Sequence, residues 1–130
     1  MPAAARDTDS VLGVDIHIVM IPTPGGEVPT PLPHPFSAKI NASVSADVKV
    51  NGLGAATVDS ESQNEPSHMP LGPRFQNEPS NKGKVQMGSM TVFINGKQAA
   101  RMGDVVMTCA DPGDMPNGTI LSGSPNVNIG

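Results

Sequence analysis

The chain has 130 residues, a formal net charge of −4 and only three large aromatic residues, all of them Phe. This length predicts one small domain, and the scarcity of Phe, Trp and Tyr excludes a large aromatic core. Because the basic residues are few and scattered, the charge pattern argues against a nucleic-acid partner and against a polybasic membrane-surface patch. The single cysteine excludes an internal disulfide, so a bound metal is the obvious means of stabilising so small a domain.

The N-terminal residues 1–10 are polar and lack the apolar stretch of a signal peptide. The longest apolar run, residues 16–21, is interrupted by His17 and is too short to span a membrane. We therefore expect synthesis in the cytoplasm without a signal peptide. Residues 11–21 also predict a strand that carries His17 and ends at the Pro-Gly-rich residues 22–26.

Residues 22–35 are rich in proline, and every other residue from position 29 to position 35 is Pro. Proline lacks a backbone N–H donor and favours an extended conformation, so we predict that residues 29–35 are extended and unpaired. This segment carries His34. Recognition by a domain that binds Pro-rich motifs is a weaker alternative, because such motifs have low specificity.

Residues 36–50 have alternating apolar positions, which predict one long strand or a strand pair. An internal repeat begins at the end of this segment. Residues 48–56 and 92–100 share the pattern V-x-[VI]-N-G-x-x-A-A. A third start, Val-Asn-Ile at residues 127–129, stops at Gly130 where the next Asn-Gly turn would begin. Since Asn-Gly favours a tight hairpin turn, the three related segments predict short hairpins in a pseudo-threefold arrangement.

Residues 60–84 are expected to form a loop. The sequence Gln-Asn-Glu-Pro-Ser occurs there twice, at residues 63–67 and 76–80, and these polar and proline residues offer no core. Only the first copy is followed by a histidine, His68, and the corresponding position in the second copy is Asn81.

The C-terminal segment, residues 88–130, predicts two further hairpins. The first has an alternating strand at residues 90–94 and an Asn-Gly turn, which needs positive φ at both central positions. The second runs from residues 105–109 through a long turn to residues 119–121. The only cysteine, Cys109, lies where the first strand of this second hairpin ends.

A set of residues in this segment matches a known family pattern. These residues are Val92-x-Ile94-Asn95-Gly96-Lys97-x-Ala99-Ala100-Arg101-x-Gly103-Asp104, then Asp111-Pro112, Asn117-Gly118 and Gly123-Ser124-Pro125-Asn126-Val127. In them the chain closely resembles the PAAR-repeat proteins, which cap the spike of contractile injection machines such as type VI secretion systems and related phage-tail-like particles. The eponymous Pro-Ala-Ala-Arg reads Gln98-Ala99-Ala100-Arg101 here. Proline at that point would only fix φ and remove a donor, so its absence affects the name more than the fold.

The resemblance implies a single all-β, cone-shaped domain over residues 1–130, with short hairpins in pseudo-threefold repeats. Its broad base would dock on a trimeric, VgrG-like spike protein, one tip chain per trimer. The implied function is mechanical: the tip sharpens a spike that a contracting sheath drives through a target envelope, in transient contact with the target membrane. The chain would be made in the bacterial cytoplasm, assembled into the particle and delivered outside the cell or into the target. No nucleic acid and no small-molecule substrate is implied.

Four residues are candidate metal ligands: His17, His34, His68 and Cys109. Zinc takes four nitrogen or sulfur ligands in a tetrahedron, and such a set would form a closed structural site. Their spacing contains no C-x₂-C or H-x₃-H signature, so spacing alone favours three ordinary histidines and a buried free thiol. The resemblance implies the metal site, because PAAR proteins bind a metal, usually zinc, through three histidines and one cysteine. Iron is the alternative metal.

Other chemistry is weakly indicated. The acidic residues between positions 104 and 117 lack the EF-hand pattern and are expected to be turn residues, with Arg101 and Asp104 paired across a turn. Walker A, G-x-S-x-G and H-E-x-x-H motifs are absent from the sequence. A nucleophilic pair of Cys109 with a histidine would need a substrate pocket that the sequence does not indicate. We therefore expect no enzyme, with a small zinc-dependent enzyme and a stand-alone metal-binding adaptor as the alternatives.

Overall fold

A computed structural model describes residues 2–130 of the protein, and the expected all-β fold is confirmed: this range contains eleven strands and no helix. The strands are β1 (Ser10–Thr23), β2 (Gly26–Ala42), β3 (Lys49–Val50), β4 (Leu53–Gly54), β5 (Glu61–Asn64), β6 (Arg74–Phe75), β7 (Lys82–Val85), β8 (Phe93–Ile94), β9 (Lys97–Gln98), β10 (Val105–Thr108) and β11 (Met115–Ile120). None of the described residues lies in a helix long and apolar enough to cross a membrane.

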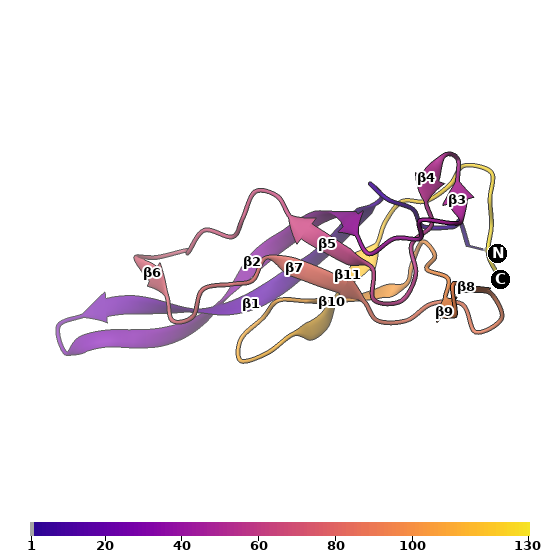
Figure 1. The fold of residues 1–130 in the computed structure, drawn as a ribbon. Coiled ribbons are helices and arrows are strands. Elements are labelled where there is room, and N and C mark those ends of the chain that lie inside the picture. Colours follow the sequence, from indigo (N-terminus) through magenta and orange to yellow (C-terminus); the bar gives the residue numbers. More distant parts are fainter. Residues whose placement is uncertain (1) are drawn as a thin grey trace.

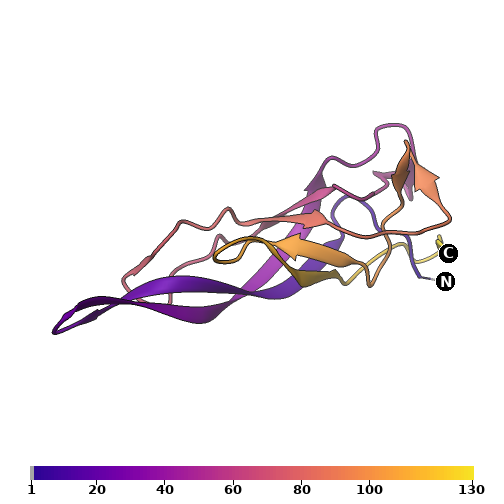
Figure 2. The same ribbon diagram turned by 90° about the horizontal axis from the view of Figure 1, so that it is seen from below.

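The molecule is an elongated wedge, which agrees with the expected taper (Figures 1 and 2). The long hairpin of β1 and β2 forms the narrow end, and its turn between Thr23 and Gly26 is the tip. The two chain ends lie side by side at the broad end, next to the small hairpins β3–β4 and β8–β9. We call this broad end the base.

The main sheet is antiparallel and closes on itself. Its strand order is β11-β10-β7-β5-β2-β1-β6, and β11 also pairs with β1, so that every strand except β6 belongs to a closed ring. Inward-facing residues of this ring form the main core, because alternate side chains of a strand face the same side. The largest of them are fully buried: Val11, Phe36, Ile40, Val85, Val106 and Ile120.

The proline-rich segment is paired, so the prediction of an unpaired segment at residues 29–35 was wrong. β2 pairs with β1 along the whole hairpin, and Pro31 lies opposite Ile18. The N–H of Ile18 donates to Asp111 Oδ2, and its carbonyl accepts from the N–H of Gln76, so the backbone of Ile18 faces away from β2. Opposite residues of an antiparallel pair are oriented alike, so the backbone of Pro31 faces the outer edge of β2. The missing N–H groups therefore leave the ladder between β1 and β2 intact.

The predicted loop at residues 60–84 contains three short strands, β5, β6 and β7, and only residues 65–73 are a long connection. β5 pairs with β2 and β7, β7 also pairs with β10, and β6 pairs with β1. The inward positions of β5 and β7 include Asn64, Gly83 and Val85, all of them buried. A narrow closed sheet leaves room for small and polar inward side chains, which hide the apolar alternation on which the prediction of strands depends.

Several strands have bounds that differ from those predicted. Residues 36–50 form neither one strand nor a strand pair, because β2 ends at Ala42 and β3 begins at Lys49. The predicted strand at 90–94 is reduced to Phe93 and Ile94, while β11 starts earlier than predicted, at Met115.

The third repeat is not truncated at Gly130, as the sequence suggested; the N-terminal residues complete it. The N–H of Ile129 donates to the carbonyl of Pro2, and Ala3 pairs with Asn128, in the way that Gly54 pairs with Lys49 in the β3–β4 hairpin. The Asn-Gly turns of the other two hairpins have positive φ, 54° and 80° at residues 51 and 52 and 53° and 79° at residues 95 and 96. The base is thus built from three equivalent hairpins, of which the third is assembled from both ends of the chain.

Candidate metal centre and docking base

The structure brings the three histidines together beside the hairpin. His17 lies on β1, His34 on β2 and His68 in the connection at residues 65–73. The ring centroids of His17 and His68 are 4.9 Å apart, and that of His34 lies 5.6 Å from His17 and 5.7 Å from His68. Cys109 follows directly after β10, with its Sγ 3.6 Å from His17 Nε2. The four candidates, up to 92 residues apart in sequence, therefore lie in one cluster.

Four side chains form a compact group of donors: Asp15, His17, His68 and Cys109. Their ligand atoms all lie within 4.8 Å of one another. Oδ2 of Asp15 lies 2.9 Å from His68 Nε2 and 3.4 Å from Cys109 Sγ. The side chains of Asp15 and His68 are 0 % and 2 % exposed. Nitrogen, sulfur and carboxylate donors buried this close together are a set that could hold a transition metal ion.

His34 adjoins this group with one ring nitrogen free. Its Nδ1 lies 2.9 Å from the carbonyl oxygen of Leu32, which can only accept, so Nδ1 carries the proton. Its Nε2 is buried and has no hydrogen-bond partner within residues 2–130. A metal-binding histidine commonly donates one ring N–H to a carbonyl and offers the other nitrogen to the metal. The His34 side chain therefore fits a metal ion, although its Nε2 lies outside the compact group.

Burial controls the protonation of the donors. Burial, and then the nearby positive charge that His68 can carry, lowers the pKa of His17. Burial, and then the Asp15 carboxylate, raises the pKa of the Cys109 thiol to about 12. Without a cation the thiol is protonated at neutral pH, and a bound metal would stabilise its thiolate form.

Asp15 is the member of the group that the sequence reasoning missed. It is held by the hydroxyl of Thr108, which donates to Oδ1, and a carboxylate with no exposure needs such partners. The signal was present as Asp-x-His at positions 15 to 17, since residues two apart in a strand face the same side. An ionisable residue beside His17 on the buried face of a strand indicates a polar site.

Two neighbours fix the cluster from outside. The Phe75 ring lies 5.7 Å from the His17 ring and 5.2 Å from the His34 ring, and it is buried. Asp111 Oδ2 accepts from the backbone N–H of Ile18 at 2.8 Å and lies 3.7 Å from His17 Nδ1, too far for a hydrogen bond. Phe75 thus covers the histidines, and Asp111 fastens the segment after Cys109 to β1.

At the base, three alanines form a closed cycle of hydrogen bonds. The N–H of Ala5 donates to Ala100 (3.0 Å), that of Ala100 to Ala56 (2.9 Å), and that of Ala56 back to Ala5 (3.0 Å). Each alanine belongs to a different repeat, and all three are at most 1 % exposed. This cycle marks the pseudo-threefold axis, and the expected pseudo-threefold repeats are confirmed.

A second apolar cluster surrounds that axis with the same symmetry. It contains one aliphatic residue and one alanine from each repeat: Val50 and Ala55, Ile94 and Ala99, Ile129 and Ala4. Equivalent residues from the three repeats therefore share one core, separate from the core inside the closed sheet.

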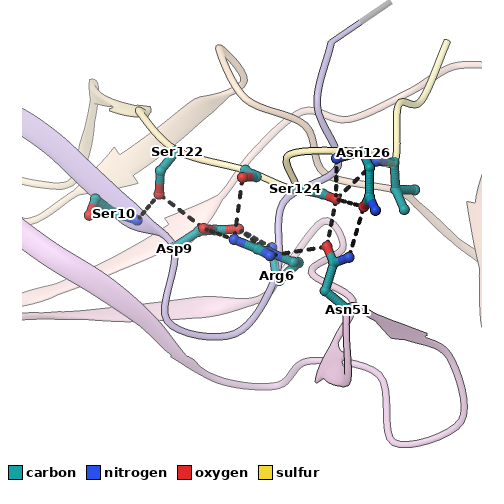
Figure 3. Close-up of polar contacts among 9 residues, drawn as sticks. Arg6, Asp9, Ser10, Asn51, Ser122, Ser124 and Asn126 are labelled. Carbon is teal, nitrogen blue, oxygen red and sulfur yellow. Dashed lines mark hydrogen bonds and ion pairs between the residues drawn. The ribbon is translucent and has the colours of Figure 1, made fainter.

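Polar side chains join each repeat to the next. Asn51 Oδ1 accepts from the Ser124 hydroxyl at 2.5 Å, and its Nδ2 donates to Asn126 Oδ1 at 2.8 Å (Figure 3). Asn95 makes equivalent contacts one repeat further on: its Oδ1 accepts from the Ser45 hydroxyl at 2.5 Å, and its Nδ2 donates to Asp47 Oδ2 at 3.0 Å. The Asn of the turn thus has two functions: it adopts positive φ, and it connects neighbouring repeats.

In two of the repeats, the axial alanine is followed directly by an arginine that pairs with an aspartate three residues later. Arg101 and Asp104 form the predicted pair across a turn, with the backbone N–H and the guanidinium of Arg101 both donating to the carboxylate. Arg6 and Asp9 form the same arrangement, at 2.7 Å for the backbone N–H (Figure 3). The resemblance between residues 100–104 and 5–9 in sequence, Ala-Arg-x-x-Asp, is short, but it was the available signal for the split repeat.

Comparison with protein families found a match in the C-terminal part of the chain. Residues 76–130 match the model of a family described as PAAR motif. A search of curated proteins found no match to the chain.

Proposed function

We propose that this chain, whose residues 76–130 match the PAAR motif, is the metal-stabilised tip of a contractile injection system and caps a trimeric, VgrG-like spike protein, one chain per trimer. Its role is structural rather than enzymatic: it sharpens the spike for puncture of a target envelope. The chain would be made in the cytoplasm without a signal peptide and leave the cell as part of the particle.

The observation that carries this proposal is the closed pseudo-threefold base. A trimer offers three equivalent binding surfaces around its axis, and a single chain can contact all three only if it repeats its own surface three times. The base does so with three hairpins around the cycle of Ala5, Ala56 and Ala100. Exposed apolar side chains on these hairpins, among them Phe93 at 57 % and Val48 at 38 %, provide area that a partner could bury.

Native mass spectrometry of the chain mixed with its cognate spike tests the docking. We expect a complex of three spike chains and one tip chain, and Phe93→Glu should weaken it at least tenfold because a charge would be buried in the interface. Leu121→Glu is the matched control, since Leu121 is 51 % exposed but lies outside the base hairpins. A 3:3 complex, no complex, or equal weakening by both variants would contradict the proposal.

We further propose that the bound metal is zinc and that His17, His34, His68 and Cys109 hold it, with Asp15 beside them. When bound, the ion supplies a cross-link among β1, β2, the connection at 65–73 and the segment after β10. The support for this is the free Nε2 of His34 and the mutual contacts of Asp15, His17, His68 and Cys109.

Elemental analysis tests the metal. Protein purified without chelator should contain about one zinc per chain, and His34→Ala should contain much less. Met69→Ala, in the same connection as His68 but 77 % exposed, should keep the full content. Well under half an equivalent in the unmodified protein would refute the metal site, and a full content in His34→Ala would leave Asp15 as the fourth ligand.

A further inference from the structure

The outer face of the β1–β2 hairpin is apolar over most of its length. Along β1 the outward positions are Leu12, Val14, Ile16, Ile18 and Met20, and the first three are 48 %, 53 % and 40 % exposed. Opposite them on β2 lie Ser37 and the four prolines at positions 35, 33, 31 and 29. Aliphatic side chains of β1 and proline rings of β2 therefore form one continuous apolar stripe from the closed sheet towards the tip.

The hairpin is also nearly free of charge. Apart from the buried histidines, Glu27 is the only ionisable side chain between Asp15 and Lys39. Glu27 is neutralised by Arg74 of β6, whose guanidinium makes two hydrogen bonds to the carboxylate, at 3.0 and 2.5 Å. The other side of the tip is apolar as well, because Ile21 pairs with Val28 and Val28 is 47 % exposed.

The free edge of this hairpin carries few hydrogen-bond donors. The carbonyl of Ile16 accepts from the N–H of Asp111, and Ile18 bonds in the same direction, so their partners Pro33 and Pro31 direct their backbone groups to the outer edge of β2. Prolines occupy positions 29, 31, 33 and 35, so this edge has no N–H group where an ordinary strand would expose one at every second residue. The number of unpaired polar backbone groups along the edge is thereby halved.

These features distinguish between two kinds of partner. A protein strand that extended the sheet at this edge would need N–H donors from β2, and prolines remove them. Hydrocarbon needs no donors, and each unpaired N–H or charge that enters it is strongly unfavourable. From Ile16 to Thr23 the hairpin measures about 25 Å at roughly 3.3 Å per residue, which exceeds the roughly 15 Å thickness of one leaflet's hydrocarbon.

We propose that the uncharged end of the β1–β2 hairpin inserts into the hydrocarbon of the target membrane, with the tip between Thr23 and Gly26 entering first. This inference rests on the proposed function and names the membrane contact surface of the tip. The apolar stripe supplies the favourable transfer, and the pairing of Glu27 with Arg74 lowers the cost of the single charged residue.

The absence of Trp and Tyr from the chain makes a direct test possible. Val28→Trp places a single fluorophore near the tip, and Met90→Trp places one at an 84 % exposed position close to the base. With phosphatidylcholine vesicles that carry brominated acyl chains, we expect blue-shifted and quenched emission from Val28→Trp and no change from Met90→Trp. Thermal melting of both variants shows that they are folded. No response from Val28→Trp, or an equal response from both, would overturn the proposal, as would a blue shift that depends on protein concentration without lipid.

A charged substitution near the tip provides a second test of the insertion. In the Val28→Trp background, Met20→Lys should reduce partitioning into the vesicles at least tenfold, because lysine is costly in hydrocarbon. Met90→Lys in the same background should leave it unchanged, and equal effects would contradict the proposal. A Val28→Trp protein that forms the 3:1 complex with the spike but ignores lipid would refute the insertion alone; one that inserts but forms no such complex would refute the docking.

Discussion

The base and the narrow half of the molecule are stabilised in different ways. In the base, equivalent residues of three repeats share one apolar cluster and one cycle of alanine hydrogen bonds, and Asn–Ser contacts connect the repeats at two of their three junctions. In the narrow half, a long hairpin, the connection at residues 65–73 and the segment after β10 meet at buried histidines, a buried aspartate and a thiol. Repetition gives the base a self-complementary core, whereas the histidine cluster lies next to the main core of the closed sheet and joins its segments through polar groups that suit a metal.

Among the tests of this difference between the two regions, metal removal should have the largest effect on stability. Structural zinc sites contribute many kcal/mol to folding, so a chelator or Cys109→Ser should cost about 4–5 kcal/mol, a fall in Tm of about 15–20 °C for a domain of this size. Calorimetry measures the loss, and amide hydrogen exchange locates it. We expect faster exchange in residues 10–42 and 65–75, with the amides of Ala5, Ala56 and Ala100 still protected. An equal loss of protection at the base would show that the two regions unfold together.

The sequence predicts the base better than the narrow half, because repetition is visible in one dimension. The pattern shared by residues 48–56 and 92–100 predicted two hairpins that the structure contains. The third repeat was missed in part because its turn is absent and its halves lie at opposite ends of the chain. Only the fold shows that Pro2 and Ile129 are partners.

In the narrow half, predictions from short stretches of sequence were wrong. Alternating prolines at residues 29–35 normally indicate an unpaired segment, and they form a strand here because the missing donors all face one edge. The duplicated polar segment predicts a loop, because small or polar residues that are buried inside the closed sheet, such as Asn64 and Gly83, leave no apolar alternation in the sequence. The spacing of Asp15 and His17 along one strand places them on the same face, but the contacts of Asp15 with His68 and Cys109 join distant parts of the chain, which residue spacing does not report.

Filling the pseudo-threefold axis should destabilise the base by an intermediate amount. Ala100 has no exposure and lies in the alanine cycle, so Ala100→Leu forces extra volume into a packed site and should cost about 3 kcal/mol. Ala46→Leu is the matched control, because Ala46 is exposed, and it should change stability by less than about 0.5 kcal/mol. Chemical denaturation of metal-loaded protein measures both. A tolerated Ala100→Leu would mean that the axis is loosely packed and that the base is not the rigid region.

The smallest expected effect comes from serine to alanine substitutions in the three repeats. They test whether the repeats contribute equally to the free energy of unfolding, as their equivalent geometry suggests. Ser45, Ser89 and Ser124 are each buried, and each hydroxyl oxygen accepts two backbone N–H groups at the start of its hairpin. Each hydroxyl also donates to the next repeat, to an Asn side chain for Ser45 and Ser124 and to the carbonyl of Gly130 for Ser89. Serine to alanine leaves these groups without their partner, so each variant should lose about 1–2 kcal/mol.

The informative result is the spread among these three variants. If the split repeat is held as firmly as the continuous ones, Ser124→Ala should match Ser45→Ala within about 0.5 kcal/mol in chemical denaturation, because equivalent bonds are lost in equivalent places. Ser60→Ala, a buried serine that accepts one N–H, from Thr57, is a control for the loss of a serine hydroxyl outside the hairpins. A Ser124→Ala that costs nothing would show that the third repeat is frayed where the two chain ends meet, and the base would then present two firm hairpins rather than three.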